Sequence, residues 1–146
     1  MYKMFAITLT LAASSAIAAD IGNVPANPVA IPQTKMTAQN AVPSIAPQAA
    51  ADIVEKQHAL IVDVRELSEV AATRIPGAIN IPLSQFSNRL AELDSYKNSP
   101  IITQCRSGRR SAEALKILAA SGFTNVQNLE GGIMAWEKAG LKTEKQ

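Results

Sequence analysis

The stretch Ile102–Gly122, ITQCRSGRRSAEALKILAASG, contains the only cysteine of the 146-residue chain, Cys105. A short apolar run rich in β-branched residues leads into this cysteine, which is typical of a buried strand. Apolar residues at helical spacing follow from Ser111 onward, and Gly122 is well placed to end that helix. The stretch therefore predicts a strand, a loop that begins at Cys105, and a helix.

The loop after Cys105 has the features of an anion-binding site. The first amides of a helix have no partner within the helix and carry partial positive charge, so they attract anions, and a thiolate is itself an anion. Gly108 takes a positive φ without penalty, which would let the loop amides converge on the sulfur. We therefore expect the Cys105 pKa to lie below that of a free thiol, which makes the sulfur a better nucleophile.

Polar and charged side chains surround this cysteine. Arg106, Arg109 and Arg110 supply positive charge that would draw in a small oxyanion, and Ser107 and Ser111 supply hydroxyl donors. A loop this short cannot aim all three arginines inward, so a solvated position or a salt bridge is the alternative for each of them. A substrate with sulfur and negative oxygens suits these residues better than a neutral one.

The rest of the sequence alternates short apolar runs with helical patterns, which predicts parallel crossovers. We expect an α/β fold in which a twisted, mostly parallel sheet carries helices on both faces, as three α/β/α layers. Further strands or extended pieces are expected in Ala59–Arg65, Ile75–Pro82 and Thr124–Leu129, and helices in Pro47–Gln57, Glu66–Thr73, Leu83–Tyr96 and Gly131–Leu141. The two glycines of LEGGIM are read as the turn that starts the last helix, with Met134 and Trp136 in the core.

The residues before this pattern have a different character. Residues 1–18 read as a signal peptide, with Lys3, a short apolar run and a small-x-small cleavage site after Ala18 or Ala19. The apolar run is too short for a stable membrane span. Residues 19–43 form a Pro/Ala-rich linker, residues 44–141 the domain, and residues 142–146 a C-terminal tail. Export, most simply to the periplasm, is therefore expected, although a lone thiol is unusual in an oxidising compartment.

The composition argues against several classes of site. A net charge of +2 does not favour nucleic-acid binding. With one cysteine and one histidine, His58, a zinc or iron–sulfur site is improbable, and His58 is read as a solvated turn residue. No glycine-rich nucleotide fingerprint follows a strand, so no cofactor or metal is expected. A single core without an exposed apolar stripe favours a monomer.

Four motifs together resemble a single rhodanese domain, over about Ser44 to Leu141. They are LIVDVRE (Leu60–Glu66), IPGAINIPL (Ile75–Leu83), QCRSGRRS (Gln104–Ser111) and LEGGIMAWEKAG (Leu129–Gly140). The resemblance implies the rhodanese-like fold and a sulfurtransferase. One departure is that Thr73 and Arg74 stand where many members of the family have Gly-His. This puts a role for that histidine in doubt and adds positive charge near the expected entrance of the site.

The resemblance also implies roles for individual residues. Cys105 would attack the outer sulfur of thiosulfate or a similar donor, carry it as a persulfide, and pass it to cyanide, a thiol or a protein acceptor. Residues 106–110 would supply the amide cradle, and their three arginines would be candidates for binding the donor. Asp63 and Arg65 would lie near the loop, with Asp63 as a structural partner that binds loop amides or an arginine.

Two other functions stay open on the sequence alone. The domain could be a non-enzymatic persulfide carrier or binding module, because the same loop would serve that purpose. It could also be a rhodanese-fold phosphatase or arsenate reductase. The tyrosine phosphatase signature, however, needs an arginine at the position of Ser111, and here Arg110 stands one place earlier.

Overall fold

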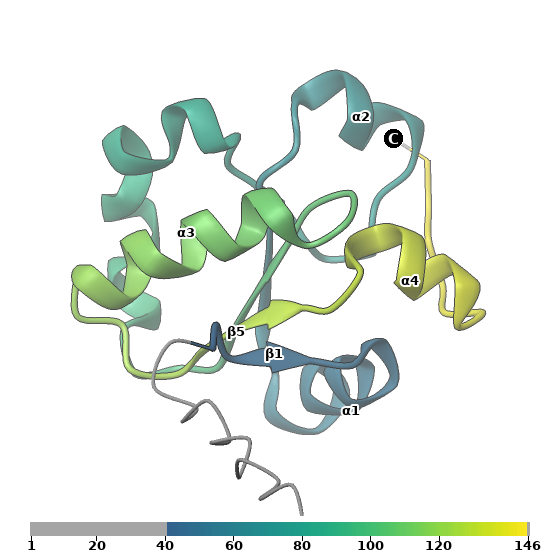
Figure 1. Cartoon of the computed structure of the whole chain (residues 1–146), viewed down its shortest axis with the longest axis horizontal. Helices are drawn as coiled ribbons and strands as arrows, with labels where there is room; N and C mark the ends of the chain where they lie inside the picture. Colours follow the sequence, from purple (N-terminus) through teal and green to yellow (C-terminus); the bar gives the residue numbers. More distant parts are fainter. Residues whose placement is uncertain (1–40, 146) are drawn as a thin grey trace, which may run out of the picture. The chain divides into compact units, whose positions relative to one another are not determined.

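Five parallel strands form one sheet within residues 41–145, the part of the chain that the computed structural model describes (Figure 1). Because all the strands run the same way, their carboxyl ends meet at one edge of the sheet. β4, which precedes Cys105, is central, between β5 and β2. In sheet order the strands are β1 (Ser44–Ile45), β5 (Val126–Leu129), β4 (Ile101–Gln104), β2 (Leu60–Asp63) and β3 (Ile79–Asn80).

Helices cover both faces of this sheet, which confirms the predicted three-layer α/β fold. On one face lie α1 (Pro47–Gln57) and α4 (Gly132–Lys138). On the other lie α3 (Arg109–Ala120) and η2 (Leu83–Tyr96). The short helix α2 (Leu67–Ala72) lies at the same end of the domain as the loop that precedes α3 (Figure 1).

Each face of the sheet has its own hydrophobic cluster. Ile101 and Ile102 are neighbours in β4 but belong to opposite clusters, because successive side chains of a strand point to opposite faces. Ile101 belongs to the cluster that contains Phe86 of η2, whereas Ile102 belongs to the cluster that contains Trp136 of α4. This double burial explains why β4 reads as a continuous apolar run rather than as an alternating one.

Two elements differ from the predictions. The helix over Leu83–Tyr96 is present with Phe86 and Leu93 buried, but it is a 3₁₀ helix rather than an α-helix. β1 was not predicted, because its two residues, Ser44 and Ile45, are too few to produce a period. Its pairing with β5 is a property of the folded sheet and not of the local sequence.

Contacts of the domain extend beyond residues 44–141 at both ends. The Asn128 amide donates to Pro43 O over 2.7 Å, and Val42 packs on the hydrophobic core. At the other end, Arg74 and Glu144 exchange two backbone hydrogen bonds of 2.8 and 2.9 Å. The predicted signal peptide and all but the last residues of the predicted linker lie outside the described residues.

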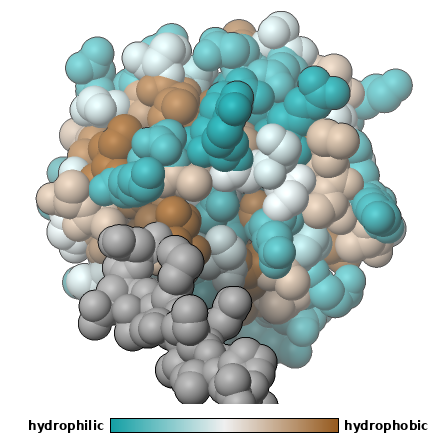
Figure 2. All heavy atoms as spheres, in the orientation of Figure 1, coloured by the Kyte–Doolittle hydropathy of each residue, from teal (hydrophilic) through white to brown (hydrophobic). Residues whose placement is uncertain are grey.

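Large hydrophobic side chains are exposed at three positions in the described part of the chain: Leu67, Tyr96 and Met134. Figure 2 shows one face of the molecule, on which small apolar areas alternate with hydrophilic side chains. Met134 was predicted to lie in the core, and that prediction is wrong, since 53% of its surface is exposed. Trp136 is buried as predicted. Within residues 41–145, no helix has the length and apolar character needed to cross a bilayer.

Candidate active site

Cys105 follows directly after β4, at the carboxyl edge of the sheet, and only 1% of its surface is exposed. The chain then turns through Gly108, which has a φ of 97° and is the N-cap of α3. The positive φ predicted for Gly108 is thus confirmed. This turn brings the start of α3 back against the sulfur, as the strand–loop–helix pattern predicts.

The sulfur of Cys105 lies among hydrogen-bond donors. The Gly108 amide donates to Sγ over 3.1 Å, and Ser111 Oγ lies 3.4 Å from it. Burial acts to raise the pKa of Cys105, but the Ser111 hydroxyl and the amides of Ser111, Ser107 and Gly108 act in the opposite direction. The net result is a pKa below the ordinary value of a thiol. Backbone amides and one hydroxyl, rather than arginine side chains, are the principal groups that favour the thiolate.

Asn128 of β5 supports this loop from the neighbouring strand. Its Oδ1 accepts a 2.6 Å hydrogen bond from Ser111 Oγ, and its Nδ2 donates to Gly108 O over 3.1 Å. Asn128 is buried and pairs in register with Thr103 of β4. The sequence analysis missed it, although a buried amide at the carboxyl end of a strand next to β4 is the signal that could have found it.

The start of α4 holds the loop from a third side. The Ile133 amide donates to Cys105 O over 2.8 Å, and the Met134 amide donates to Arg106 O over 3.3 Å. A side chain at Gly132 would collide with Cys105 O and with the backbone of Arg106. The predicted Gly-Gly turn is present, with Gly131 as the N-cap of α4, but its second glycine also lets α4 approach the cysteine loop.

The three arginines of the loop differ in their surroundings. Arg110 binds Glu69 of α2 through two hydrogen bonds of 2.8 Å. This pairing raises the pKa of Arg110, with a smaller contribution from Cys105, and lowers the pKa of Glu69. Arg106 and Arg109 are exposed, and neither makes an ion pair within residues 41–145. Two of the three guanidinium groups are thus free to meet a dissolved anion.

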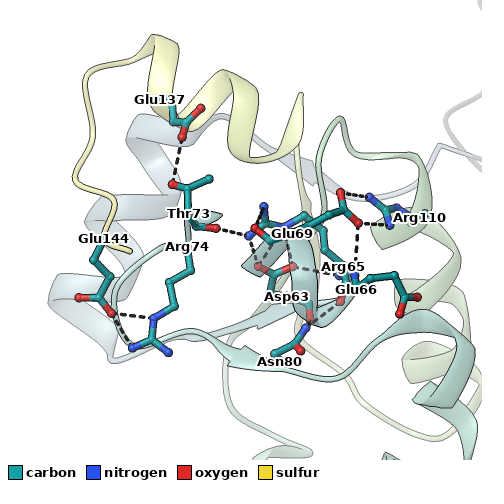
Figure 3. Close-up of polar contacts among 10 residues, drawn as sticks. All are labelled: Asp63, Arg65, Glu66, Glu69, Thr73, Arg74, Asn80, Arg110, Glu137 and Glu144. Carbon is teal, nitrogen blue, oxygen red and sulfur yellow. Dashed lines mark hydrogen bonds and ion pairs between the residues drawn. The ribbon is translucent and has the colours of Figure 1, made fainter. Parts of the chain in front are cut away.

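Asp63 and Arg65 form a buried ion pair beside this loop (Figure 3). Arg65 Nη2 donates to Asp63 Oδ2 over 2.6 Å and to Thr73 O over 2.8 Å, and Nη1 donates to Glu69 O over 3.4 Å. The arginine that Asp63 binds is therefore Arg65. Because the Arg65 guanidinium binds carbonyl groups within α2, at Glu69, and just after it, at Thr73, this pair fixes the helix that carries Glu69.

The position that departs from the usual Gly-His pair lies at the edge of this network (Figure 3). Thr73 Oγ1 donates to Glu137 of α4 over 3.2 Å. Arg74 Nη2 lies 2.7 Å from Glu144 Oε1. The positive charge expected at Arg74 is therefore paired with Glu144 rather than free at the entrance of the site.

A cleft of about 440 Å³ adjoins the cysteine loop. Its walls come from α2, from α4 and from Arg106, the residue after Cys105. The exposed side chain of Met134 lies in its wall. Across residues 41–145, no group of three or more His, Cys, Asp or Glu side chains is placed to hold a metal ion.

Comparison with known proteins gives the family. Residues 46–139 match the model of the rhodanese-like domain. The chain belongs to the rhodanese family. A sulfurtransferase of Allochromatium vinosum is 36% identical to this rhodanese over 89 residues, which cover 61% of this chain and 81% of that protein. The thiosulfate sulfurtransferase PspE of Escherichia coli is 37% identical over 70 residues, or 48% of this chain and 67% of that protein.

Solved structures agree with the sequence comparison. A rhodanese-related protein from Thermoplasma volcanium superposes with a TM-score of 0.65 at 28% identity, covering 71% of this chain and 99% of that one. In the rhodanese described here, the predicted residues Cys105, Gly108 and Ser111 come together around the sulfur. Asp63 binds an arginine, as one of the two expected alternatives has it, and that arginine is Arg65. Asn128, Glu69 and Gly132 are the contributors that the sequence analysis did not identify.

Proposed function

We propose that this rhodanese moves a sulfane sulfur from thiosulfate, or a donor of the same kind, through a persulfide on Cys105 to a thiophilic acceptor. The observation that carries this proposal is the Cys105 sulfur itself, buried and bound by the Gly108 amide. Such a cradle stabilises a negative sulfur without any neighbouring base. A larger fraction of the sulfur is therefore thiolate, the nucleophilic form, than in an ordinary thiol at the same pH.

In the first half-reaction, the Cys105 thiolate attacks the outer sulfur of thiosulfate. A bond forms between Sγ and that sulfur, the sulfur–sulfur bond of thiosulfate breaks, and its electron pair leaves with sulfite. The two free guanidinium groups of Arg106 and Arg109 are the candidates for binding the sulfonate oxygens. Arg110 contributes fixed positive charge through its position beside the loop, since Glu69 already occupies its donors.

In the second half-reaction, an acceptor such as cyanide or a thiol attacks the outer sulfur of the persulfide. The bond between that sulfur and Cys105 Sγ breaks, and the electron pair returns to Sγ. The same amides that favour the thiolate before the reaction therefore favour it as a leaving group. In each step one bond to the transferred sulfur forms as another breaks, so the reaction consumes no external oxidant or reductant.

The experiment that tests this function is the steady-state formation of thiocyanate from thiosulfate and cyanide. The wild-type protein should turn over, and Cys105→Ser should not. No thiocyanate from either protein would refute thiosulfate:cyanide transfer as an activity of this chain. Hydrolysis of a phosphate ester by the wild type would favour the phosphatase alternative instead.

A persulfide carrier is the second candidate, and the cleft with the exposed Met134 supports it. A carrier would accept sulfur slowly from free thiosulfate and pass it rapidly to one protein partner. Comparing the two rates on the same preparation separates the two functions.

We also propose that the protein is exported, most simply to the periplasm, after removal of residues 1–18. The support is the sequence of that segment: a lysine, a short apolar run and a small-x-small site. Cell fractionation with N-terminal sequencing of the mature protein tests this. A full-length chain that starts at Met1 in the cytoplasmic fraction would contradict it.

A further inference from the structure

We propose that the cleft between α2 and α4 is the docking site of the sulfur acceptor, and that this acceptor is a cysteine-containing segment of another protein. In that segment a carboxylate lies beside the cysteine, followed by an apolar and then a basic side chain. The inference rests on the proposed persulfide chemistry of Cys105 and adds the identity of the acceptor.

The position of the cleft is the first support. Arg106 lines it and directly follows Cys105, and Glu69 lines it while binding Arg110 of the same loop. The first amides of α4, at Ile133 and Met134, hold the backbone of Cys105 and Arg106. An acceptor seated in this cleft is therefore held against the loop that carries the persulfide.

The size of the cleft is the second support. Its volume of about 440 Å³ lies within the range of about 300–1,000 Å³ that accommodates organic ligands or several side chains. Thiosulfate and cyanide fill only a small part of that space, since one water molecule takes up about 30 Å³. A site built for these ions alone would not require such a cleft, whereas a peptide segment would occupy it.

The cleft is also held at a fixed width. Thr73 Oγ1, at the end of α2, donates to Glu137 of α4, so a hydrogen bond joins the two walls. Arg65 donates to Thr73 O and is fixed in turn by Asp63 (Figure 3). Because the cleft is preformed, no free energy is spent on ordering its walls when an extended segment binds.

Charge and polarity along the cleft define the occupant. Arg106, which directly follows Cys105, is exposed and makes no ion pair within residues 41–145. Ala72, Ile133 and the exposed Met134 give the lining an apolar part. Arg65 and Glu69 also line the cleft, but each is already paired, with Asp63 and Arg110 respectively. Glu137 supplies negative charge one helical turn further along α4, where its one side-chain hydrogen bond within residues 41–145 comes from the neutral Thr73. A carboxylate, an apolar group and a cation, in that order from the thiol, complement these three parts.

The transfer step follows the chemistry of the second half-reaction. The acceptor thiol attacks the outer sulfur of the Cys105 persulfide, and a new sulfur–sulfur bond forms on the acceptor. The bond to Cys105 Sγ breaks, its electron pair stays on Sγ, and the proton of the acceptor thiol ends on the transferred sulfur. The Gly108 amide then receives the Cys105 thiolate.

The test compares two peptides that differ only in the order of their charges, Asp-Cys-Leu-Lys and Lys-Cys-Leu-Asp, with blocked ends. The protein is loaded with thiosulfate and desalted, and sulfur transfer to each peptide is followed by mass spectrometry. The first peptide should react about fivefold faster, as expected for exposed charge pairs. Free cysteine should react more slowly than the first peptide.

Two pairs of variants locate the effect. Met134→Ser should slow transfer to the first peptide, and Leu67→Ser is its control, because Leu67 is exposed on α2 but does not line the cleft. Glu137→Lys should abolish the preference for the first peptide. Its control is Thr73→Val, which removes the same hydrogen bond without changing charge. In all four variants, thiosulfate should form the Cys105 persulfide at the same rate as in the wild type.

Equal rates for the two peptides, or an unchanged rate in Met134→Ser, would overturn the proposal. Free cysteine that reacts as fast as the first peptide would overturn the peptide as occupant. The loading step is measured separately, so a failure to load counts against thiosulfate as donor alone. In that event polysulfide supplies the persulfide, and the same comparison of peptides decides the docking site.

Discussion

Ser111 Oγ lies 2.6 Å from Oδ1 of Asn128 and 3.4 Å from Sγ of Cys105, so one hydroxyl hydrogen faces two acceptors. The shorter contact is the stronger hydrogen bond, and it holds the hydroxyl toward Asn128 while Cys105 is a thiol. When the sulfur becomes an anion, it competes better for the same hydrogen. The Gly108 amide, by contrast, has Sγ as its one acceptor in the part of the chain that the structure describes, and it donates to Sγ in both states.

Replacing Ser111 with alanine should raise the pKa of Cys105, because it removes the side-chain donor that favours the thiolate. Alkylation by iodoacetamide near neutral pH should slow by about tenfold at most, since the backbone donors remain. The profile of alkylation rate against pH measures this. In Ser107→Ala the profile should stay in place, because only the Ser107 amide contributes at the sulfur. An unchanged profile in Ser111→Ala would show that the hydroxyl serves Asn128 alone.

The lowered pKa of Cys105 should also appear in the stability of the protein. The folded thiol titrates at a lower pH than the unfolded thiol, whose ordinary pKa is about 8.5. Between these two values the unfolded chain binds more protons, so stability rises with pH and is fully present above the unfolded pKa. It is lost as pH falls through the folded pKa.

Urea unfolding of the wild type and of Cys105→Ser, from about pH 6 to about pH 9.5, tests this linkage. The free energy of unfolding of the wild type, relative to that of the variant, should increase as pH rises. A difference that stays flat, or that falls with pH, would mean that the loop does not favour the thiolate.

The pair between Glu69 and Arg110 should matter more than an ordinary surface ion pair. Glu69→Gln should lower the free energy of unfolding by about 1 kcal/mol, because it removes the negative charge from a half-buried ion pair. The amide oxygen of glutamine can still accept from the Glu66 amide, so the capping box is kept and the loss reports on the pair with Arg110. The pKa of Glu69 is lowered, chiefly by Arg110, so this contribution is lost as pH falls through the folded pKa.

The control for this prediction is Glu92→Gln in η2. Glu92 makes a comparable pair of hydrogen bonds to Arg89, but both side chains are more exposed. Urea unfolding near neutral pH should show a smaller loss for this variant than for Glu69→Gln. Equal losses would mean that the contact between α2 and α3 adds nothing beyond a surface pair.

Gly132 should tolerate no side chain. An alanine there would collide with Cys105 O and Arg106, and the residue also has a φ of 60°. Gly140→Ala is the matched control, because its φ is 72° but its side chain would meet no other atom. In the control, backbone strain alone should lower the free energy of unfolding by about 1 kcal/mol. Gly132→Ala should lower the free energy of unfolding by more than the control does. It should also form the persulfide more slowly, which mass spectrometry of samples quenched at successive times measures. Equal effects of the two variants would contradict the role of Gly132 in holding the loop.

The part of the site that sequence could predict is the part that is local in the chain. Cys105, Gly108 and Ser111 lie within one strand–loop–helix unit, so their spacing alone places them around the sulfur. The alternation of apolar runs and helical patterns likewise predicted the parallel sheet, because each crossover needs a helix of that length.

The part that sequence could not predict comes from distant segments. Asn128, Glu69 and Gly132 reach the loop from a neighbouring strand and from two other helices, and nothing near them in sequence indicates that contact. Met134 was assigned to the core by its type, yet its helix has a buried side that Ile133 and Trp136 already fill. The exposed face of α4 can be identified only in the folded structure, where it forms part of the cleft.

The measurement that tests the central claim most directly is the intact mass of the protein after thiosulfate and then after cyanide, beside Cys105→Ser. The account predicts that the wild type gains the mass of one sulfur atom and loses it again with cyanide, and that the variant gains none. A wild type that gains no sulfur, or a variant that gains it as well, would contradict a persulfide on Cys105.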